Sequence, residues 1–405
     1  MFGNVLCIAI ALAALGGCAG VHDVPQPSQL PWHDEAFAYD AALVTVTQEE
    51  LFRLDPMLME RLKDPQVQRL STSKRLEHLL GLLYGEQMKP FVYAAGHSTV
   101  ATETWQNKSG DCLSLTVLAY SMAREMNMVS QMQEVKVPVL FDRRGGVDFL
   151  NDHVNVLFRR SGPLQWLHGR LQPDDTVVDF EPQIGSNREG HALSDKGILS
   201  RYYNNIAAEH LVNDSQSLAY AYFKAAILAD PAFAASYSNL ALLYQRAGLV
   251  TDAEQWLRQA IEVSDETLVP LSSLHQLLLA QGRSAEAAHY ARLLQSRREM
   301  DPYYWIGLGL KYLQDGKNRE SIKALEEAQR LTNGFAEVHR YLAVAYWRVG
   351  EQAQANEQLD LLASMKGGGA DVTALRKKFK VPRPAYDQGP CHIPSSLMSP
   401  PCNMQ

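Results

Sequence analysis

The sequence lacks the features that define several large classes of protein. Its 405 residues contain five cysteines, and no two of them form a CxxC pair, which excludes a disulfide scaffold and the zinc sites built from such pairs. No apolar run reaches the roughly 18 residues of a transmembrane helix. Asp and Glu total 45 against 38 Lys and Arg, a net charge of −7. This balance argues against a nucleic-acid partner, because binding phosphates requires a surplus of cations.

Motifs for metals and cofactors are also missing. The chain has no His-Glu-x-x-His segment and no glycine-rich phosphate loop, so we predict neither a metal nor a cofactor. Hydrophobic residues make up 46% and charged residues 20%, a composition typical of globular proteins. The length predicts two or three domains, at about 150 residues each.

The first residues are typical of an exported protein. Residues 1–17 carry no charge, and residues 5–15 are almost wholly apolar, which predicts a signal peptide. The small residues before Cys18 resemble the lipobox of bacterial lipoproteins. That resemblance implies removal of residues 1–17, diacylation of Cys18 and, with Ala19 next, a periplasmic position on the outer membrane. The alternative is a plain signal peptide. Residues 18–34, which are rich in proline and polar side chains, are predicted to be a tether.

Residues 35–195 are predicted to form an α+β domain. Residues 37–84 are mostly helical in pattern, with an apolar stripe at Leu76, Leu79, Leu80 and Leu83. A second helix is predicted over residues 112–128. Three strands are then expected, over residues 135–139, 153–158 and 176–180. Helices followed by strands favour an α+β arrangement.

Three residue types in this domain could perform nucleophilic catalysis. The apolar helical run begins at Cys112, where the helix dipole and unpaired N–H groups would favour the thiolate and lower its pKa. His153 begins a predicted strand and Asp179 lies in another. If these strands are neighbours, His153 would accept the thiol proton and Asp179 would orient the imidazole.

The same residues resemble the transglutaminase-like superfamily of papain-like cysteine enzymes, over about residues 91–182. Its pattern is a cysteine that opens a helix after Gly-Asp, a histidine that begins a strand, and an aspartate ahead of a proline. The resemblance implies a papain-like/transglutaminase-like fold and a Cys112–His153–Asp179 triad. Two departures leave the substrate class open. Asn155 stands where the family has Trp, and two residues separate Asp179 from Pro182.

Each assignment has an alternative. Cys112 could be an inert core thiol, His153 a structural histidine, and Glu181 could replace Asp179 as the acid, because it follows two residues later on the same strand face. The oxyanion hole would use the backbone N–H of Cys112 together with a side-chain donor, either Gln106 or Trp105.

The second half of the chain repeats every 34 residues. Gly248, Gly282, Gly316 and Gly350 fall in step. From the second repeat onward, further columns align with them: Tyr237, Leu271, Trp305 and His339; Leu240, Leu274, Leu308 and Leu342; Ala253, Ala287, Ser321 and Ala355. This pattern resembles the tetratricopeptide repeat, which implies an all-α solenoid of about five antiparallel helix pairs over residues 200–369. In the first repeat, Asp214 takes the glycine place.

The tail, residues 370–405, is rich in proline and is predicted to be extended or disordered. Cys391 and Cys402 are candidates for a disulfide in an oxidising periplasm, the alternative being two free thiols.

The favoured hypothesis is an envelope-anchored cysteine hydrolase of peptide or amide bonds, with repeats that recruit a protein or peptide partner. Attack by an amine instead of water on the acyl-enzyme would make it a protein transglutaminase, and a cell-wall amidase is a further substrate option. A hypothesis of another class is a lipoprotein adaptor whose repeats assemble an envelope complex and whose cysteine domain is not catalytic.

Overall fold

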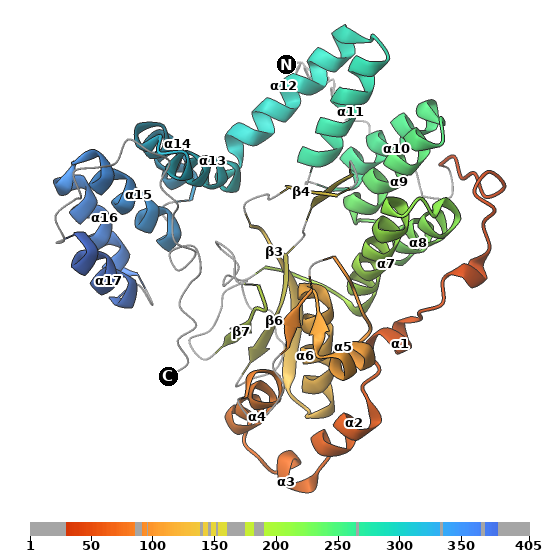
Figure 1. Cartoon of the computed structure of the whole chain (residues 1–405), viewed down its shortest axis with the longest axis horizontal. Helices are drawn as coiled ribbons and strands as arrows, with labels where there is room; N and C mark the ends of the chain where they lie inside the picture. The colour runs from red at the N-terminus through yellow and green to blue at the C-terminus, as the bar shows by residue number, and fades with distance from the viewer. Residues whose placement is uncertain are drawn as a thin grey trace, which may run out of the picture.

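The computed structural model describes residues 30–85, 91–94, 96–137, 141–144, 147–150, 153–159, 175–181, 190–264, 267–332, 335–365 and 369–379. The chain forms an N-terminal part of short helices around small sheets, followed by a long series of paired helices (Figure 1). Within the described residues, no helix has both the length and the apolar character needed to span a bilayer.

The first helices begin at residues whose side chains cap them. Thr47 forms a capping box with Glu50, Asp55 and Asp64 each precede a proline at the first helical turn, and Ser71 accepts the backbone N–H of Lys74. These side chains satisfy N–H groups that the helix cannot pair. The elements are η2 (Ala41–Leu43), α1 (Gln48–Phe52), α2 (Pro56–Leu62), α3 (Pro65–Gln68), α4 (Thr72–Tyr84), β1 (Val92–Tyr93), α5 (Ala101–Asn107) and β2 (Ser109–Gly110).

The main sheet of the described residues is antiparallel, in the order β7-β6-β3-β8. Its strands are β3 (Val129–Val135), β6 (His153–Arg159), β7 (Thr176–Val178) and β8 (His191–Ala192). Val135 pairs with His153, and Val156 pairs with Val178. Two smaller pairs accompany it: β1 with β2 in parallel, and a hairpin of β4 (Phe141–Arg144) and β5 (Val147–Leu150).

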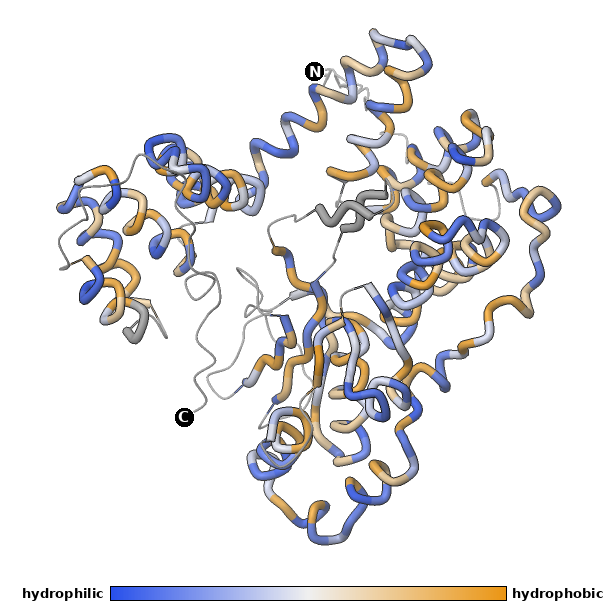
Figure 2. The backbone as a smooth tube through the Cα atoms, viewed as in Figure 1, coloured by the Kyte–Doolittle hydropathy of each residue, from blue (hydrophilic) through white to orange (hydrophobic). Residues whose placement is uncertain are grey.

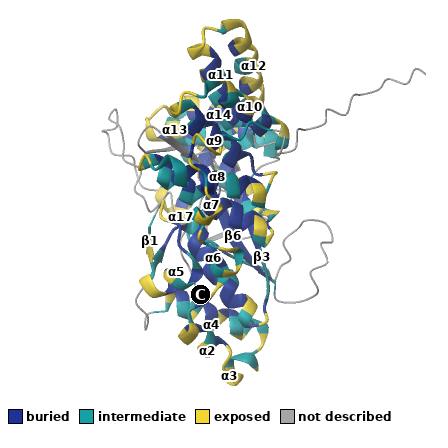
Figure 3. Cartoon of the chain, turned by 90° about the vertical axis from the view of Figure 1, so that its right-hand side faces the viewer, coloured by how far each residue is buried: buried dark blue, intermediate teal, exposed yellow. Residues whose placement is uncertain are grey.

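Helix α6 (Cys112–Glu125) lies against this sheet (Figure 1). Val117, Met122, Val154 and Val156 are buried in one cluster, which extends into the first helix pairs. Figure 3 shows the buried residues concentrated along α6, α7, α8 and β6. The predicted helix at Cys112 and the strand at His153 are confirmed. The strand predicted over residues 135–139 was placed too late, because residues 129–135 are the ones that pair with β6.

The predicted 34-residue repeat of helix pairs is confirmed. The pairs are α7 (Asp195–Val212) with α8 (Gln216–Ala229), α9 (Ala234–Arg246) with α10 (Val250–Val263), α11 (Leu268–Ala280) with α12 (Ser284–Met300), α13 (Pro302–Gln314) with α14 (Asn318–Thr332), and α15 (Ala336–Val349) with α16 (Gln352–Ser364). Each of the four glycines has φ between +74° and +92°, and Asp214 has φ +57°. Asp adopts this left-handed conformation more readily than most other residues. Asp214 therefore takes the place of glycine in the turn between α7 and α8, and the first repeat begins with α7.

A break divides the solenoid after its third helix pair. Buried residues from α6 through α12 form one hydrophobic cluster that ends at Ala287, and those of α13–α16 form others. Figure 1 shows α13–α17 (α17, Gly369–Phe379) apart from α7–α10. Leu308 on α13 is partly exposed, although Leu240 and Leu274 in its column are fully buried. Helix α12 runs to Met300, so that only Asp301 separates it from α13. Figure 2 shows many hydrophilic residues along α12.

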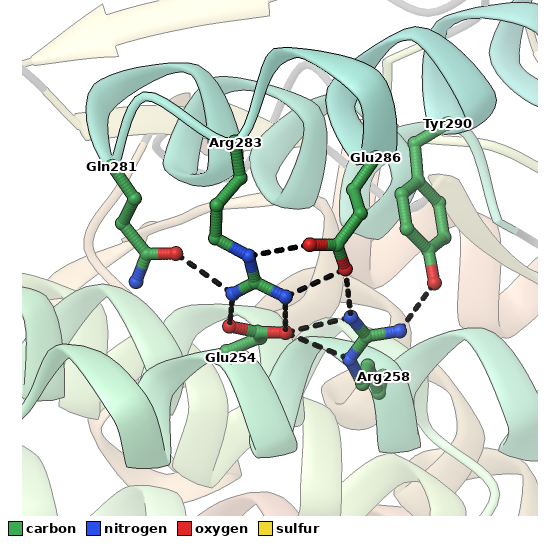
Figure 4. A network of polar contacts seen from close by, with 6 residues as sticks. All are labelled: Glu254, Arg258, Gln281, Arg283, Glu286 and Tyr290. Atoms are coloured by element: carbon green, nitrogen blue, oxygen red, sulfur yellow. Dashed lines mark hydrogen bonds and ion pairs between the residues drawn. The ribbon is translucent and has the colours of Figure 1, made fainter.

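A charged network joins the second and third helix pairs (Figure 4). Arg258 donates to Glu254 at 2.6 Å, and Arg283 donates to both Glu254 and Glu286, to the latter at 2.6 Å. Burial acts to raise the pKa of Glu254, but the hydrogen bonds from Arg283 and Arg258 outweigh it and lower that pKa. The network therefore holds α10 against α12 while most of the charge stays at the surface.

Close packing of α13 on α14 predicts the effect of a single methyl group. A Cβ at Gly309 would lie 2.6 Å from Cγ of the buried Leu325. Gly309→Ala is therefore expected to destabilise the protein by about 1–3 kcal/mol through overpacking, measured by denaturant unfolding. Gly81→Ala in α4 is the control, because its Cβ meets nothing within 4 Å; we expect a gain of up to about 1 kcal/mol from helix propensity. Equal effects of the two changes would contradict this account.

Candidate active site around Cys112

Cys112 is the first residue of α6, and Asp111 caps that helix. Oδ1 of Asp111 accepts the backbone N–H of Ser114 at 2.8 Å and the hydroxyl of Ser114 at 2.6 Å. Asp111 is buried, so its acceptor oxygens are used inside the protein rather than by solvent. The cap fixes the start of the helix and thereby the position of the Cys112 side chain.

The surroundings of the thiol differ from the sequence-based expectation. We predicted that the helix N-terminus would lower the pKa of Cys112. In the structure, burial raises that pKa, and the carboxylates of Asp111 and Glu181 raise it further. A hydrogen bond from the backbone N–H of Val154 acts in the opposite direction but is outweighed. Burial and the neighbouring carboxylates thus favour the neutral thiol of Cys112 over the thiolate.

His153, the first residue of β6, meets Asp179, the residue that follows β7. The strand predicted over residues 176–180 ends at Val178, so Asp179 lies just outside it. Nε2 of His153 lies 2.7 Å from Oδ2 of Asp179, and both side chains are largely buried. Oδ1 of Asp179 also accepts the backbone N–H of Glu181 at 3.0 Å. The carboxylate is thus held by two donors and in turn orients the imidazole. With Nε2 engaged, the ring nitrogen left to face a reacting group is Nδ1.

Strand β6 also brings the thiol to this pair. The N–H that contacts Cys112 belongs to Val154, the residue after His153, and the hydroxyl of Thr116 on α6 lies 3.4 Å from the carbonyl oxygen of Val154. Cys112, His153 and Asp179 therefore gather at one end of β6, although they are far apart in the sequence.

Glu181, the alternative acid in the sequence, has a different partner. Its carboxylate accepts a hydrogen bond from the hydroxyl of Tyr93. Burial and this hydrogen bond both raise the pKa of Tyr93, which also interacts electrostatically with Cys112. Tyr93 was not identified from the sequence. Its position depends on parallel pairing of residues 92–93 with residues 109–110, and short strand pairs of this kind leave no readable pattern.

The two predicted oxyanion donors lie on α5. The amide of Gln106 donates to Asp55 at 2.9 Å on an exposed surface, so the structure does not bring that donor to the thiol. The ring of Trp105 is buried and packs against Lys108, whose Nζ lies 2.9 Å from the ring centroid. Burial lowers the pKa of Lys108 to about 8. Trp105 therefore has a packing role in this structure.

The first repeat helix reaches the thiol helix through Ser98. Asn205 on α7 donates to Oγ of Ser98 at 3.0 Å, and that hydroxyl donates to Oδ2 of Asp111 at 2.5 Å. Glu209 on α7 accepts the backbone N–H of Ser98 at 3.3 Å. Two hydrogen bonds in series thus connect the solenoid with the residue before Cys112, and no sequence pattern indicated this link.

The remaining predicted sites fall elsewhere. Cys18, Cys391 and Cys402, and with them the lipid anchor and the disulfide, lie outside the described residues. Within the described part of the chain, no group of three or more His, Cys, Asp or Glu side chains is placed to hold a metal ion.

Comparisons with known proteins match the repeats. No family model and no curated protein matches the chain. Solved structures similar to it include YrrB, a TPR protein with an unusual peptide-binding site (17% identity, 44% of this chain, 92% of YrrB, TM-score 0.24). MamA from Desulfovibrio magneticus RS-1 is 17% identical, over 47% of this chain and all of the other, with TM-score 0.24. The pilF protein of Pseudomonas aeruginosa is 20% identical, over 45% and 87%, with TM-score 0.24. With similarity this low, the repeat assignment rests on the chain's own 34-residue period and helix pairs.

Proposed function

We propose that this chain is a cysteine hydrolase or acyltransferase of the transglutaminase-like type. The observation that carries the proposal is the buried His153–Asp179 hydrogen bond, together with the thiol of Cys112 at the backbone N–H of Val154, the residue after His153. A histidine oriented by a carboxylate next to a cysteine is the arrangement needed to activate a sulfur nucleophile.

The neutral thiol defines the first chemical step. Nδ1 of His153 removes the proton from Cys112 as the sulfur attacks a substrate carbonyl, and Asp179 stabilises the imidazolium that forms. The tetrahedral oxyanion lies near the backbone N–H of Cys112, at the N-terminus of α6. Collapse of this intermediate breaks the carbon–nitrogen bond. His153 gives its proton to the departing amine, and a thioester remains on Cys112.

The second step decides the class of reaction. Water, deprotonated by His153, attacks the thioester and releases a carboxylic acid, which completes hydrolysis. An amine in place of water gives a new amide, which is transglutaminase chemistry. Both outcomes share the same acyl-enzyme. The proposal places the enzyme in the bacterial envelope, lipid-anchored through Cys18 on the periplasmic face of the outer membrane, with a protein or peptide partner on the repeats.

Trapping of the acyl-enzyme tests this function. Protein incubated with envelope extract and analysed by peptide mass spectrometry is expected to carry a hydroxylamine-sensitive adduct on Cys112. His153→Ala is expected to lose the adduct, because the neutral thiol then has no base. An adduct of equal yield in His153→Ala would contradict the proposed role of the histidine.

The raised thiol pKa favours a second candidate function, a lipoprotein adaptor with a non-catalytic cysteine domain. A neutral thiol is the usual state of a structural cysteine. Full cellular activity of Cys112→Ala, together with no adduct on the unmodified protein, would support the adaptor.

A further inference from the structure

Residues 30–39, which we call the N-terminal strap, lie on the first two helix pairs of the solenoid. Figure 1 shows the segment before α1 running beside α8 and α10. The ring of Trp32 meets that of Trp256 on α10, with centroids 4.6 Å apart. The ring of Phe37 stacks on Tyr220 of α8, also at 4.6 Å. The predicted tether over residues 18–34 therefore ends in a segment that is packed on the repeats.

Polar and charged groups pair across the same contact. Nε2 of His33 lies 2.6 Å from Oδ2 of Asp252. The carboxylate of Asp34 accepts from Nζ of Lys224 at 2.6 and 2.8 Å. The side chain of Lys224 on α8 is mostly buried, whereas that of Asp34 in the strap is about half exposed. The helical surface therefore supplies the cation of this pair, and the strap supplies the anion. Burial acts to raise the pKa of Asp34, but the hydrogen bond from Lys224 and its charge lower that pKa.

Two tyrosines of the repeats form hydrogen bonds with the strap. The hydroxyl of Tyr244 donates to the carbonyl of Pro31 at 2.8 Å, and that of Tyr220 donates to Asp34 at 2.7 Å. The backbone N–H of His33 lies 3.1 Å from the Tyr220 oxygen and 3.2 Å from that of Tyr244. Main-chain hydrogen bonds combined with sites for individual side chains are how proteins recognise peptides. Residues 34–38 of the strap form turns, in which the backbone N–H of Phe37 donates to the carbonyl of His33 and that of Tyr39 to the carbonyl of Asp34.

We propose that α8, α9 and α10 form a peptide-recognition site, which the chain fills with its own strap. Its ligand is a short segment that folds into a turn, with an aromatic residue, an acidic residue two positions later and a second aromatic residue three positions after that, as in Trp32, Asp34 and Phe37. A segment of this chemistry from another protein occupies the site when the strap leaves. This inference is independent of the chemistry at Cys112.

The strap competes with a peptide from another protein for this site, and it does so from within the same chain. A covalently linked ligand acts at an effective concentration on the order of millimolar. A free peptide at micromolar concentration therefore does not displace it, and the site stays closed to weak ligands. A partner must either bind more tightly than the strap or draw the strap away.

The test uses a fluorescent peptide with the sequence of residues 30–40 and the full chain. Trp32→Ala with Asp34→Ala weakens the strap and leaves the helices unchanged. We expect this variant to bind the peptide at least about tenfold more tightly than the unmodified protein does, measured by fluorescence anisotropy. Circular dichroism checks the fold. If the double variant is unfolded, Asp34→Ala alone replaces it, because that side chain is half exposed.

Matched controls address the chemistry of recognition. A peptide with Ala in place of Trp32 and Phe37 is expected not to bind, and neither is the original peptide to a strap-weakened protein that also carries Lys224→Glu. Equal binding of a scrambled peptide, or no binding by a folded strap-weakened variant, would overturn the proposal. Equal affinity of the unmodified protein would show that the strap does not occupy the site.

Discussion

Asp179→Asn is expected to reduce acyl transfer to Cys112 by about 10³–10⁴-fold while the protein stays folded. The carboxylate accepts a hydrogen bond from Nε2 of His153 at 2.7 Å in a buried setting. An asparagine amide that donates to Nε2 would move the ring proton to Nδ1, the nitrogen that must accept the thiol proton. It would also remove the negative charge that stabilises the imidazolium. The measurement is the rate of acylation by p-nitrophenyl acetate, with the site verified by peptide mass spectrometry.

Glu181→Gln is the matched control for this change. Glu181 is also a carboxylate close to Cys112, but it is bonded to Tyr93 rather than to His153. We expect its replacement to alter acyl transfer by less than about tenfold, because no proton transfer depends on it. A large loss in Glu181→Gln with a small one in Asp179→Asn would assign the orienting acid to Glu181 instead.

The thiol of Cys112 is expected to titrate at lower pH in Asp111→Asn. The negative charge of Asp111 raises the pKa of Cys112, second only to burial, so removing that charge favours the thiolate. A fall of about one pKa unit, equivalent to about tenfold more thiolate at a fixed pH, is the expected size. Asparagine is also a good helix cap, so α6 should keep its start. The measurement is the rate of Cys112 alkylation by iodoacetamide as a function of pH.

The control removes the same charge from another helix cap. Asp64 caps α3 through the backbone N–H of Gln66 at 2.7 Å and is not among the groups that shift the pKa of Cys112. Asp64→Asn is expected to leave the alkylation profile unchanged. If both variants shift the profile equally, or if Asp111→Asn shifts it upward, the electrostatic role of Asp111 is wrong.

Local pattern was sufficient to predict much of the fold. The 34-residue period required no knowledge of tertiary structure, because each glycine marks a left-handed turn that few side chains adopt easily. The helix starting at Cys112 was equally readable, since Asp111 caps it and an apolar run follows. The strand over residues 129–135 was missed because four of its seven residues are polar, and it is its pairing with β6 that makes it a strand.

For the candidate site, the sequence predicted which types of residue are present but not the contacts that they make. The order of Cys112, His153 and Asp179 indicated an activated thiol, and the roles of these residues stay a proposal. Tyr93, Ser98 and Asn205 carried no recognisable signal, because their contacts join segments 13 to 107 residues apart or depend on a two-residue strand pair. The direction of the thiol pKa was also predicted wrongly, since a helix terminus is visible in sequence but burial and the approach of Glu181 are not.

The sequence by itself determined the repeat and its register, the start of α6 and the kinds of group that can react, because each depends on residues within one or two turns of backbone. Tertiary structure alone decided which carboxylate holds His153, how α7 reaches Asp111 and where the strap binds. These depend on hydrogen bonds and burial between distant segments, and the strength of such contacts is set by the surroundings that the folded chain creates.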